Sequence, residues 1–393
     1  MHCLPISLLC VVGLATASQV TLPIARGSYG TDSSQLLLCD ESRQDPFAAA
    51  LNITESRRNM LSSYYPTGVI TECDAYNSSY MPPATARFYD NEYSIVALSF
   101  QTSQPGSQHG LVFPVVLFSP GLGDSRLHYS ILSHSLASQG FIVIAMDHPY
   151  DADVVEFPDG STVLGVNLAN EDSLTIDQIQ HRFDVRVQDV SFVLDQLASP
   201  HVRRRLFGFN DWKTDPCNII MYGHSLGGAT AVASAWNDTR LVASVNLDGR
   251  QYGSQPALGS KQPALGSKQP IMLVASEIHT ATNDPTWVAL WNATQQTTKA
   301  MIKLNGTNHK GLSDFPLIVG SLPDYTDLPQ TVRDVLTFEL GTMSGARVDT
   351  LLPTLVARFL SYAIGQASSP LPDLGDGNYP DVYLLENTVL GRS

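Results

Sequence analysis

The chain has 393 residues, of which 43% are hydrophobic, and its 37 acidic side chains outnumber 23 basic ones to give a formal charge of -14. This length allows one large globular domain, or at most two. The chain is acidic, and its longest basic run is Arg203–Arg205. It therefore has no basic surface suited to a polyanion, which excludes nucleic acid as a partner.

Residues 1–17 have the pattern of a secretory signal peptide. A short apolar stretch ends in Ala15-Thr16-Ala17, the arrangement of small residues that precedes signal cleavage. The stretch is shorter than the roughly 20 residues that span a bilayer, and no later segment is long and apolar enough. We therefore expect a secreted protein, with residues 18–393 forming a single domain and no stable insertion into a membrane.

A secretory route suggests glycosylation and disulfide formation. If Cys3 and Cys10 leave with the signal, we expect Cys39 to pair with Cys73 and Cys217 to remain a buried free thiol. Five Asn-x-Ser/Thr sequons occur, and the fifth, Asn305, is doubtful because it precedes a candidate catalytic histidine by only a few residues. The four sequons expected to carry glycans are Asn52, Asn77, Asn237 and Asn292.

Residues 18–110 form an irregular N-terminal extension. Two of its segments, Asn59–Tyr65 and Tyr93–Gln101, alternate like antiparallel strands that could extend one edge of a sheet. Further along, residues 150–180 are polar and rich in aspartate, which favours a cap over a site. The acidic Asp151-Ala152-Asp153 within them is interpreted as a solvated loop.

Residues 111–316 alternate short apolar runs with helical patterns, which is typical of a mostly parallel sheet covered by helices. The predicted strands are Leu111–Ser119, Phe141–Asp147, Asn218–Gly223, Leu241–Leu247, Ile271–Ala275 and Ala300–Leu304. The predicted helices are Leu127–Ser138, Arg182–Leu197, Ser225–Trp236 and Asp284–Gln295, and residues 317–393 form a helical C-terminal region that includes Pro353–Gly365. A heptapeptide at 256–262 recurs at 263–269, which we interpret as a duplication within a surface loop.

A Gly-x-Ser-x-Gly motif follows one of the predicted strands and precedes a predicted helix. Such a turn from strand to helix raises the hydroxyl of Ser225 above the sheet edge, as in the α/β-hydrolase fold. A serine nucleophile needs a carboxylate and a histidine, which follow it in that order in this fold. His309 is the histidine that follows the last predicted strand, whereas His224 and His279 are better suited to structural or supporting roles.

Position alone leaves the acid open among Asp248, Glu277 and Asp284, which follow two successive strands. An oxyanion hole needs a backbone N–H from the residue after the serine and another from an earlier loop. Leu226 supplies the first donor. We expect Leu122, in the glycine-lined loop after the first central strand, to supply the second.

Five segments together resemble the plasma-type platelet-activating-factor acetylhydrolases: Val115–Gly123, Leu136–Val143, Gly223–Thr230, Asn246–Asp248 and Ser313–Phe315. The resemblance implies a secreted, metal-independent serine esterase with the α/β-hydrolase fold that cleaves short or oxidised acyl chains from phospholipids. It also implies that Asp248 is the catalytic acid. The chain departs from the family at Pro120, where a histidine is usual, and over Asp147–Asp151, so the substrate preference does not carry over.

Neither a metal nor a cofactor is expected, because the sequence has no metal-ligand motif and no dinucleotide fingerprint. The sequence therefore predicts a serine esterase acting on a short-acyl phospholipid or similar lipid ester. The alternatives are an esterase, lipase or acyltransferase for a secreted metabolite or triacylglycerol, and a catalytically silent hydrolase fold that only binds. The oligomeric state is left open.

Overall fold

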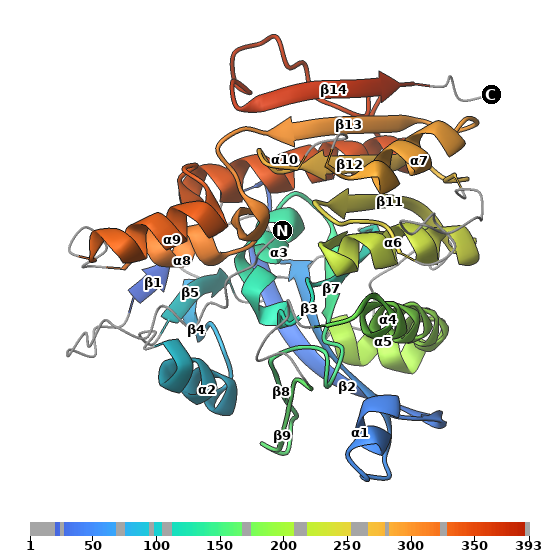
Figure 1. Cartoon of the computed structure of the whole chain (residues 1–393), viewed down its shortest axis with the longest axis vertical. Coiled ribbons are helices and arrows are strands. Elements are labelled where there is room, and N and C mark those ends of the chain that lie inside the picture. The colour runs from blue at the N-terminus through green and yellow to red at the C-terminus, as the bar shows by residue number, and fades with distance from the viewer. Residues whose placement is uncertain are drawn as a thin grey trace.

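A mixed sheet of nine strands runs through the molecule (Figure 1). The computed structural model describes residues 20–23, 27–67, 75–93, 98–103, 112–166, 174–207, 218–252, 266–279, 283–322 and 328–389. In spatial order the strands are β14 (Val382–Thr388), β13 (Lys299–Leu304), β12 (Ile271–Ala275), β11 (Leu241–Leu247), β10 (Ile219–His224), β6 (Val115–Ser119), β7 (Ile142–Met146), β3 (Ser56–Pro66) and β2 (Thr31–Gln44). The strands from β13 to β7 pair in parallel, while β14 at one edge and β3 and β2 at the other pair antiparallel.

Helices cover both faces of this sheet because successive strand residues point to opposite sides. In β6, Val116 and Phe118 join the apolar cluster that contains α3 (Ser130–Ala137) and α10 (Gly345–Ala363). Val115 and Leu117 join the opposite cluster, with α4 (Ile176–Leu197), α5 (Pro200–Phe207) and α6 (Leu226–Asn237). The remaining helices are α1 (Pro46–Ala50), α2 (Pro83–Tyr93), η2 (Arg126–Tyr129), α7 (Pro285–Ala293), η4 (His309–Leu312), α8 (Phe315–Gly320) and α9 (Gln330–Leu340).

The six strands predicted between residues 111 and 316 are all present, and β11 and β12 agree with the prediction residue for residue. Two helices are longer than predicted at their N-termini. Helix α4 begins at Ile176, where Thr175 and Gln178 form a reciprocal capping box. Helix α10 begins at Gly345, before the predicted start at Pro353, so this proline lies inside the helix.

The N-terminal extension divides between two sheets, which corrects one prediction. The segment Asn59–Tyr65 lies within β3 and does extend the main sheet. Tyr93, in contrast, ends α2, and β5 (Leu98–Ser103) pairs with β1 (Val20–Leu22) and β4 (Ala75–Ser79) in a separate three-stranded sheet. This segment cannot extend the main sheet beside β7 because β3 already pairs there.

Most of the described part of residues 150–180 packs against the core. Its hairpin of β8 (Val154–Glu156) and β9 (Thr162–Leu164) buries Val155 and Phe157 against Met60 of β3. The prediction of a solvated loop at Asp151 was wrong, since that carboxylate is 1% exposed and forms an ion pair with Arg186. Residues 167–173 of the predicted cap lie outside the described residues.

The C-terminal region is only partly helical. After α8, α9 and α10, the chain ends in β14, which pairs with β13 and forms one edge of the sheet. Short-range periodicity indicated a helical region but not β14, whose pairing partner among the described residues lies about 80 residues earlier.

The structure shows the exposure of several predicted glycosylation sites and of one cysteine. The sequons Asn52, Asn237 and Asn292 are exposed, whereas the side chain of Asn77 is outside the described residues. Cys39 is an exposed thiol of β2 with no disulfide within the described ranges, and its expected partner Cys73, like Cys217, lies outside them. Among the helices described, none is long and apolar enough to cross a membrane.

Candidate active site

Ser225 occupies a strained turn between β10 and α6, with φ 53° and ψ -122°. The flanking glycines are required by close backbone approach. A Cβ on Gly223 would lie 2.3 Å from the carbonyl carbon of Gly227, and one on Gly227 would lie 2.0 Å from the carbonyl oxygen of Ser119. The turn therefore forms only with glycine at both positions, and it brings Ser225 into the wall of a cavity.

The structure brings Ser225, His309 and Asp248 into one hydrogen-bonded row. The Nε2 atom of His309 lies 2.9 Å from the hydroxyl oxygen of Ser225, and its Nδ1 atom lies 2.6 Å from Oδ2 of Asp248. Asp248 is 5% exposed, so the pair is shielded from water at its acidic end. In this arrangement Nε2 of His309 can take the proton of the serine hydroxyl. The carboxylate of Asp248 fixes the orientation of the imidazole ring.

Asp248 sits in a turn that its neighbours lock in place. Its φ of 59° is unusual for a residue other than glycine. The side chain of Asn246 accepts from the N–H of Gly249 and donates to its carbonyl oxygen, both at 2.7 Å. Burial alone would raise the pKa of Asp248, but hydrogen bonds from His279 and His309 outweigh it and hold that pKa well below its ordinary range.

Of the three carboxylates that sequence position left open, only Asp248 lies against His309. Glu277 accepts a hydrogen bond from the N–H of Gly306 at 2.8 Å and helps to shape the loop before His309. Asp284 caps α7 and contacts His279. The geometry thus supports the choice that the family resemblance implied.

Leu122 and Leu226 lie beside Ser225 in the wall of the same cavity. Leu226 is the first residue of α6, where backbone N–H groups have no partner within the helix. Leu122 follows β6, and β6 pairs with β10, so the two loops meet where the strand order reverses. Both residues therefore lie where the predicted oxyanion hole requires them, beside Ser225.

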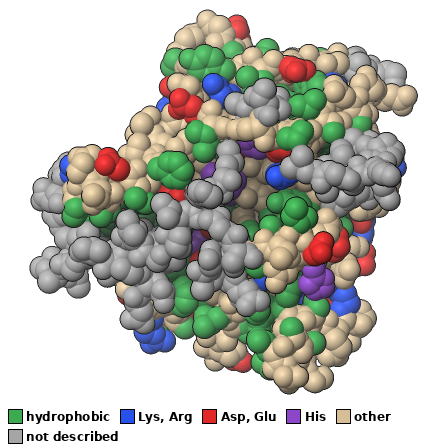
Figure 2. Space-filling model, viewed as in Figure 1, with side chains coloured by type: hydrophobic (Ala, Val, Ile, Leu, Met, Phe, Trp, Pro, Cys, Tyr) green, Lys and Arg blue, Asp and Glu red, His purple; other side chains and the backbone are tan. Residues whose placement is uncertain are grey.

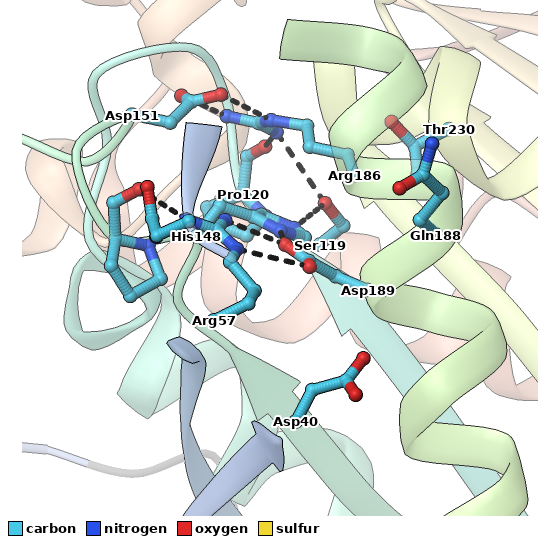
Figure 3. Close-up of polar contacts among 12 residues, drawn as sticks. Asp40, Arg57, Ser119, Pro120, His148, Asp151, Arg186, Gln188, Asp189 and Thr230 are labelled. Atoms are coloured by element: carbon cyan, nitrogen blue, oxygen red, sulfur yellow. Dashed lines mark hydrogen bonds and ion pairs between the residues drawn. The ribbon is translucent and has the colours of Figure 1, made fainter. Parts of the chain in front are cut away.

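Arg186 of α4 holds the loop that contains Leu122, which the sequence did not reveal (Figure 3). Its guanidinium donates to the carbonyl oxygens of Pro120 at 2.5 Å and Gly121 at 2.9 Å. The same group forms a two-pronged ion pair with Asp151, at 2.6 and 2.8 Å. Because Arg186 is 1% exposed, these contacts are made without competition from water.

A second buried group continues from this loop toward the N-terminal strands (Figure 3). The hydroxyl of Ser119 lies 2.9 Å from Nε2 of His148, whose Nδ1 atom lies 2.9 Å from Asp189. Arg57 of β3 donates to both oxygens of Asp189 and to Asp45. Burial lowers the pKa of His148, and Arg186 adds to the effect. The histidine that connects Ser119 to Asp189 is therefore neutral.

His224 supports the loop that presents His309, as its position beside Ser225 suggested. Its Nε2 atom donates to the carbonyl oxygen of His309 at 2.9 Å, and its Nδ1 atom lies 2.8 Å from the hydroxyl of Tyr129. Burial, reinforced by His309, lowers the pKa of His224 to about 3 and keeps it neutral. Lys310 fixes the same loop through a 2.8 Å ion pair with Asp124.

The cavity around Ser225 has a volume of about 260 Å³. The rest of its wall, which the sequence did not identify, comes from separated elements: Ile179 from α4, Tyr252 and Arg250 after β11, and Phe338 and Glu339 from α9. Ile179 is the only lining residue that comes from the described part of the predicted cap. In Figure 2, histidine side chains are visible near the middle of the view, and charges of both signs are scattered over this face.

Within the described ranges, no group of three histidine, cysteine, aspartate or glutamate residues is placed to hold a metal ion. The histidines near Ser225 instead contact carboxylates, a hydroxyl and a carbonyl oxygen.

Comparison with known proteins fits this geometry. A sequence profile of the family described as platelet-activating factor acetylhydrolase, isoform II, matches residues 88–324. The chain belongs to this family. A protein of Arthroderma benhamiae named probable 1-alkyl-2-acetylglycerophosphocholine esterase is 29% identical over 94% of this chain and 95% of its own length. The platelet-activating factor acetylhydrolase of Gallus gallus is 25% identical over 60% of each chain.

Solved structures extend the likeness to the whole fold. A ferulic acid esterase from Streptomyces cinnamoneus superposes with a TM-score of 0.73 at 27% identity, covering 94% of this chain and all of the other. Together with the doubly covered, mostly parallel sheet, this establishes the α/β-hydrolase fold. The chain is therefore a carboxylic ester hydrolase of the platelet-activating factor acetylhydrolase family.

Proposed function

We propose that this protein is a secreted serine esterase that hydrolyses a short-acyl phospholipid, or a similar lipid ester, through an acyl-enzyme. The observation that carries the proposal is the row from Ser225 through His309 to Asp248, with 2.9 and 2.6 Å between successive polar atoms, in the wall of a cavity. In this proposal Ser225 is the nucleophile, His309 the general base and acid, and Asp248 the residue that orients the imidazole.

The reaction takes two steps. The hydroxyl oxygen of Ser225 attacks the ester carbonyl carbon while His309 takes its proton, and the backbone N–H groups of Leu122 and Leu226 stabilise the oxyanion. The intermediate collapses by breaking the ester bond, and His309 returns the proton to the departing alcohol. Water then attacks the acyl-enzyme with His309 again as base, which releases the carboxylic acid and restores Ser225.

Two observations support a short acyl chain. The Arthroderma relative, which aligns over 94% of this chain, is named for an acetylated glycerophosphocholine. The cavity of about 260 Å³ is below the roughly 300–1,000 Å³ typical of sites that enclose a drug-sized ligand, so it suits a small group beside Ser225. Its apolar wall of Leu122, Leu226 and Ile179 suits an acyl chain better than a charged group.

A small-molecule ester is the second candidate, because the ferulic acid esterase of Streptomyces cinnamoneus covers 94% of this chain at a TM-score of 0.73. Phe338 and Tyr252 in the cavity wall would suit a flat aromatic acyl group as well as an aliphatic one. Acyl transfer to an alcohol in place of water uses the same acyl-enzyme.

Secretion, glycans and the disulfide belong to the same proposal. Residues 1–17 would be removed as a signal peptide, and the exposed sequons Asn52, Asn237 and Asn292 are accessible to glycosylation, with Asn77 as a fourth candidate. The thiol of Cys39 lies exposed on β2, and we propose that it pairs with Cys73 in the secreted protein. Residues 18–393 would form one domain, because strands from both ends of the chain join the same sheet.

The decisive experiment compares the protein with its S225A variant on p-nitrophenyl esters and on phosphatidylcholines whose second acyl chain varies from acetyl to palmitoyl. We expect hydrolysis to fall with chain length and S225A to lose roughly 10⁴-fold or more in kcat with an unchanged circular dichroism spectrum. Turnover retained in S225A would contradict the assignment. Preference for feruloyl esters over acetylated phospholipid would favour the second candidate.

A further inference from the structure

A second histidine contacts the carboxylate that orients His309. The Oδ1 atom of Asp248 accepts hydrogen bonds from the N–H of Ser276 at 2.6 Å and from Nδ1 of His279 at 3.0 Å. The other ring nitrogen of His279, Nε2, lies 3.0 Å from Oδ2 of Asp284. His279 therefore stands between two carboxylates, on the side of Asp248 that faces away from His309.

The two contacts of His279 require a proton on both ring nitrogens. A neutral imidazole carries one N–H, whereas each nitrogen here faces an acceptor that cannot donate when ionised. Burial by itself would lower the pKa of His279, but Asp248 and Asp284 outweigh it and raise that pKa to about 9. At neutral pH the ring is an imidazolium that offsets part of the charge of Asp248.

The surroundings fix this ring in place. Its face packs on Trp287, with the ring centres 4.2 Å apart. Asp284 uses its other oxygen to accept from the N–H and hydroxyl of Thr286 at the start of α7, so it cannot turn away freely. The indole N–H of Trp287 donates to the carbonyl oxygen of Gly249 at 2.7 Å, which ties α7 back to the turn of Asp248.

We propose that His279, held by Asp284, is a positioning residue that fixes the rotamer and charge of Asp248 so that Asp248 can orient His309. This rests on the proposed function of Ser225, His309 and Asp248. Without His279, the donor that remains to Oδ1 of Asp248 among the described residues is the N–H of Ser276. The carboxylate then rotates more freely about its side-chain bond, and the imidazole of His309 spends less time aligned with the serine hydroxyl.

The charge of His279 also affects the electrostatic field at His309. The titratable groups that face it are Asp248 on the β11 side and Asp284 on α7, with His309 beyond Asp248. The same cavity wall also holds Arg250, Tyr252 and Glu339. Removal of a positive charge next to Asp248 strengthens the net negative field at His309. We therefore expect the acid limb of the pH profile of hydrolysis to move to higher pH.

The test measures kcat, KM and the pH profile of p-nitrophenyl acetate hydrolysis for H279F and H279Q. Phenylalanine keeps the packing on Trp287 and removes both donors, whereas glutamine keeps one neutral donor. We expect H279F to lose roughly 10- to 100-fold in kcat with KM within about twofold, and the acid limb of its pH profile to move to higher pH. The loss in H279Q should be smaller, with the limb moved in the same direction.

Matched controls separate positioning from general damage. H201Q changes an exposed histidine of α5 and should leave kcat and the acid limb unchanged. D284N keeps the size of the helix cap and should give part of the H279F effect on the pH profile. If H279F does not fold, as judged by circular dichroism, H279Q and D284N decide the question by the same readouts.

The outcomes distinguish this inference from the proposed function. If the unmodified protein hydrolyses the ester and S225A does not, while folded H279F matches the unmodified protein in kcat and acid limb, His279 has no positioning role. If S225A retains the turnover, the proposed function itself fails, whatever His279 does.

Discussion

At the scale of single residues, the site depends on two strained positions that face each other. Ser225 and Asp248 both have positive φ, and the N–H of Ser225 donates to the carbonyl oxygen of Leu247, the residue before Asp248. A Cβ on Gly249 would lie 2.0 Å from the carbonyl oxygen of Ser225. The two turns therefore pack directly on each other, so a change in one turn displaces the proposed catalytic side chain on the other.

The choice of acid can be tested by comparing D248N with E277Q. We expect D248N to lose roughly 10⁴-fold in kcat, because an amide no longer favours the imidazole tautomer and the imidazolium that the reaction needs. E277Q should stay within about threefold of the unmodified protein, because Glu277 contacts the N–H of Gly306 and not His309. Steady-state hydrolysis of a short-chain ester decides the matter, and a larger loss in E277Q would overturn the assignment of Asp248.

His279 also predicts a pH dependence of stability. Its pKa is about 9 in the folded protein against an ordinary 6.5, so the folded state binds this proton more tightly than the unfolded state. The stabilisation from His279 is complete below pH 6.5 and is lost as the pH rises through 9. The Tm difference between the unmodified protein and H279Q, measured from pH 6 to 10, should therefore shrink with rising pH, and a constant difference would contradict a charged His279.

At the scale of elements, local patterns were sufficient where an element is buried and regular. The central strands are continuous apolar runs bounded by glycine, proline or aspartate, and the motif around Ser225 identified both the strand before it and the helix after it. The patterns failed where long-range pairing decides the structure. Nothing local in Val382–Thr388 shows that it pairs with β13, and nothing in Leu98–Ser103 shows that β3 excludes it from the main sheet.

The same limit applies to the site. Ser225 and His309 follow from a motif and from chain order, and Asp248 from family resemblance. Arg186 gave no such signal, because a charged residue among the apolar positions of a helix looks like part of its solvated face. Its role depends on Asp151 and on two backbone carbonyl groups more than 60 residues away, and only the folded chain brings these together.

The contacts that Arg186 of α4 makes with the loop of Leu122 predict that a change at Arg186 lowers kcat. R186K keeps the charge that Asp151 needs but cannot hold both oxygens of Asp151 and both carbonyl groups of the loop. We expect roughly a 10- to 100-fold loss of kcat as the N–H of Leu122 becomes less well placed. Kinetics on a short ester would show this, with R204K, an exposed arginine of α5, as the control. Unchanged kcat in folded R186K would show that the loop holds its shape unaided.

At the scale of the whole molecule, the secretory proposal predicts the covalent state of the mature protein. Material secreted from a eukaryotic host should begin at residue 18 and lose mass on enzymatic deglycosylation. Peptide mapping should find glycans at some of Asn52, Asn77, Asn237 and Asn292, and none at Asn305, which lies in the loop that presents His309. A retained N-terminus or a glycan on Asn305 would contradict these expectations.

The pairing of Arg57 with Asp189 has a consequence for any attempt to shorten this enzyme. Strand β3 lies between β7 and β2, and its buried arginine neutralises a carboxylate of α4 that contacts His148. A fragment limited to residues 88–324, the part that the family profile matches, would leave Asp189 without that partner and would expose the edge of β7. We therefore expect the segment that matches the family profile not to fold on its own, and the shortest active form to retain the hairpin of β2 and β3.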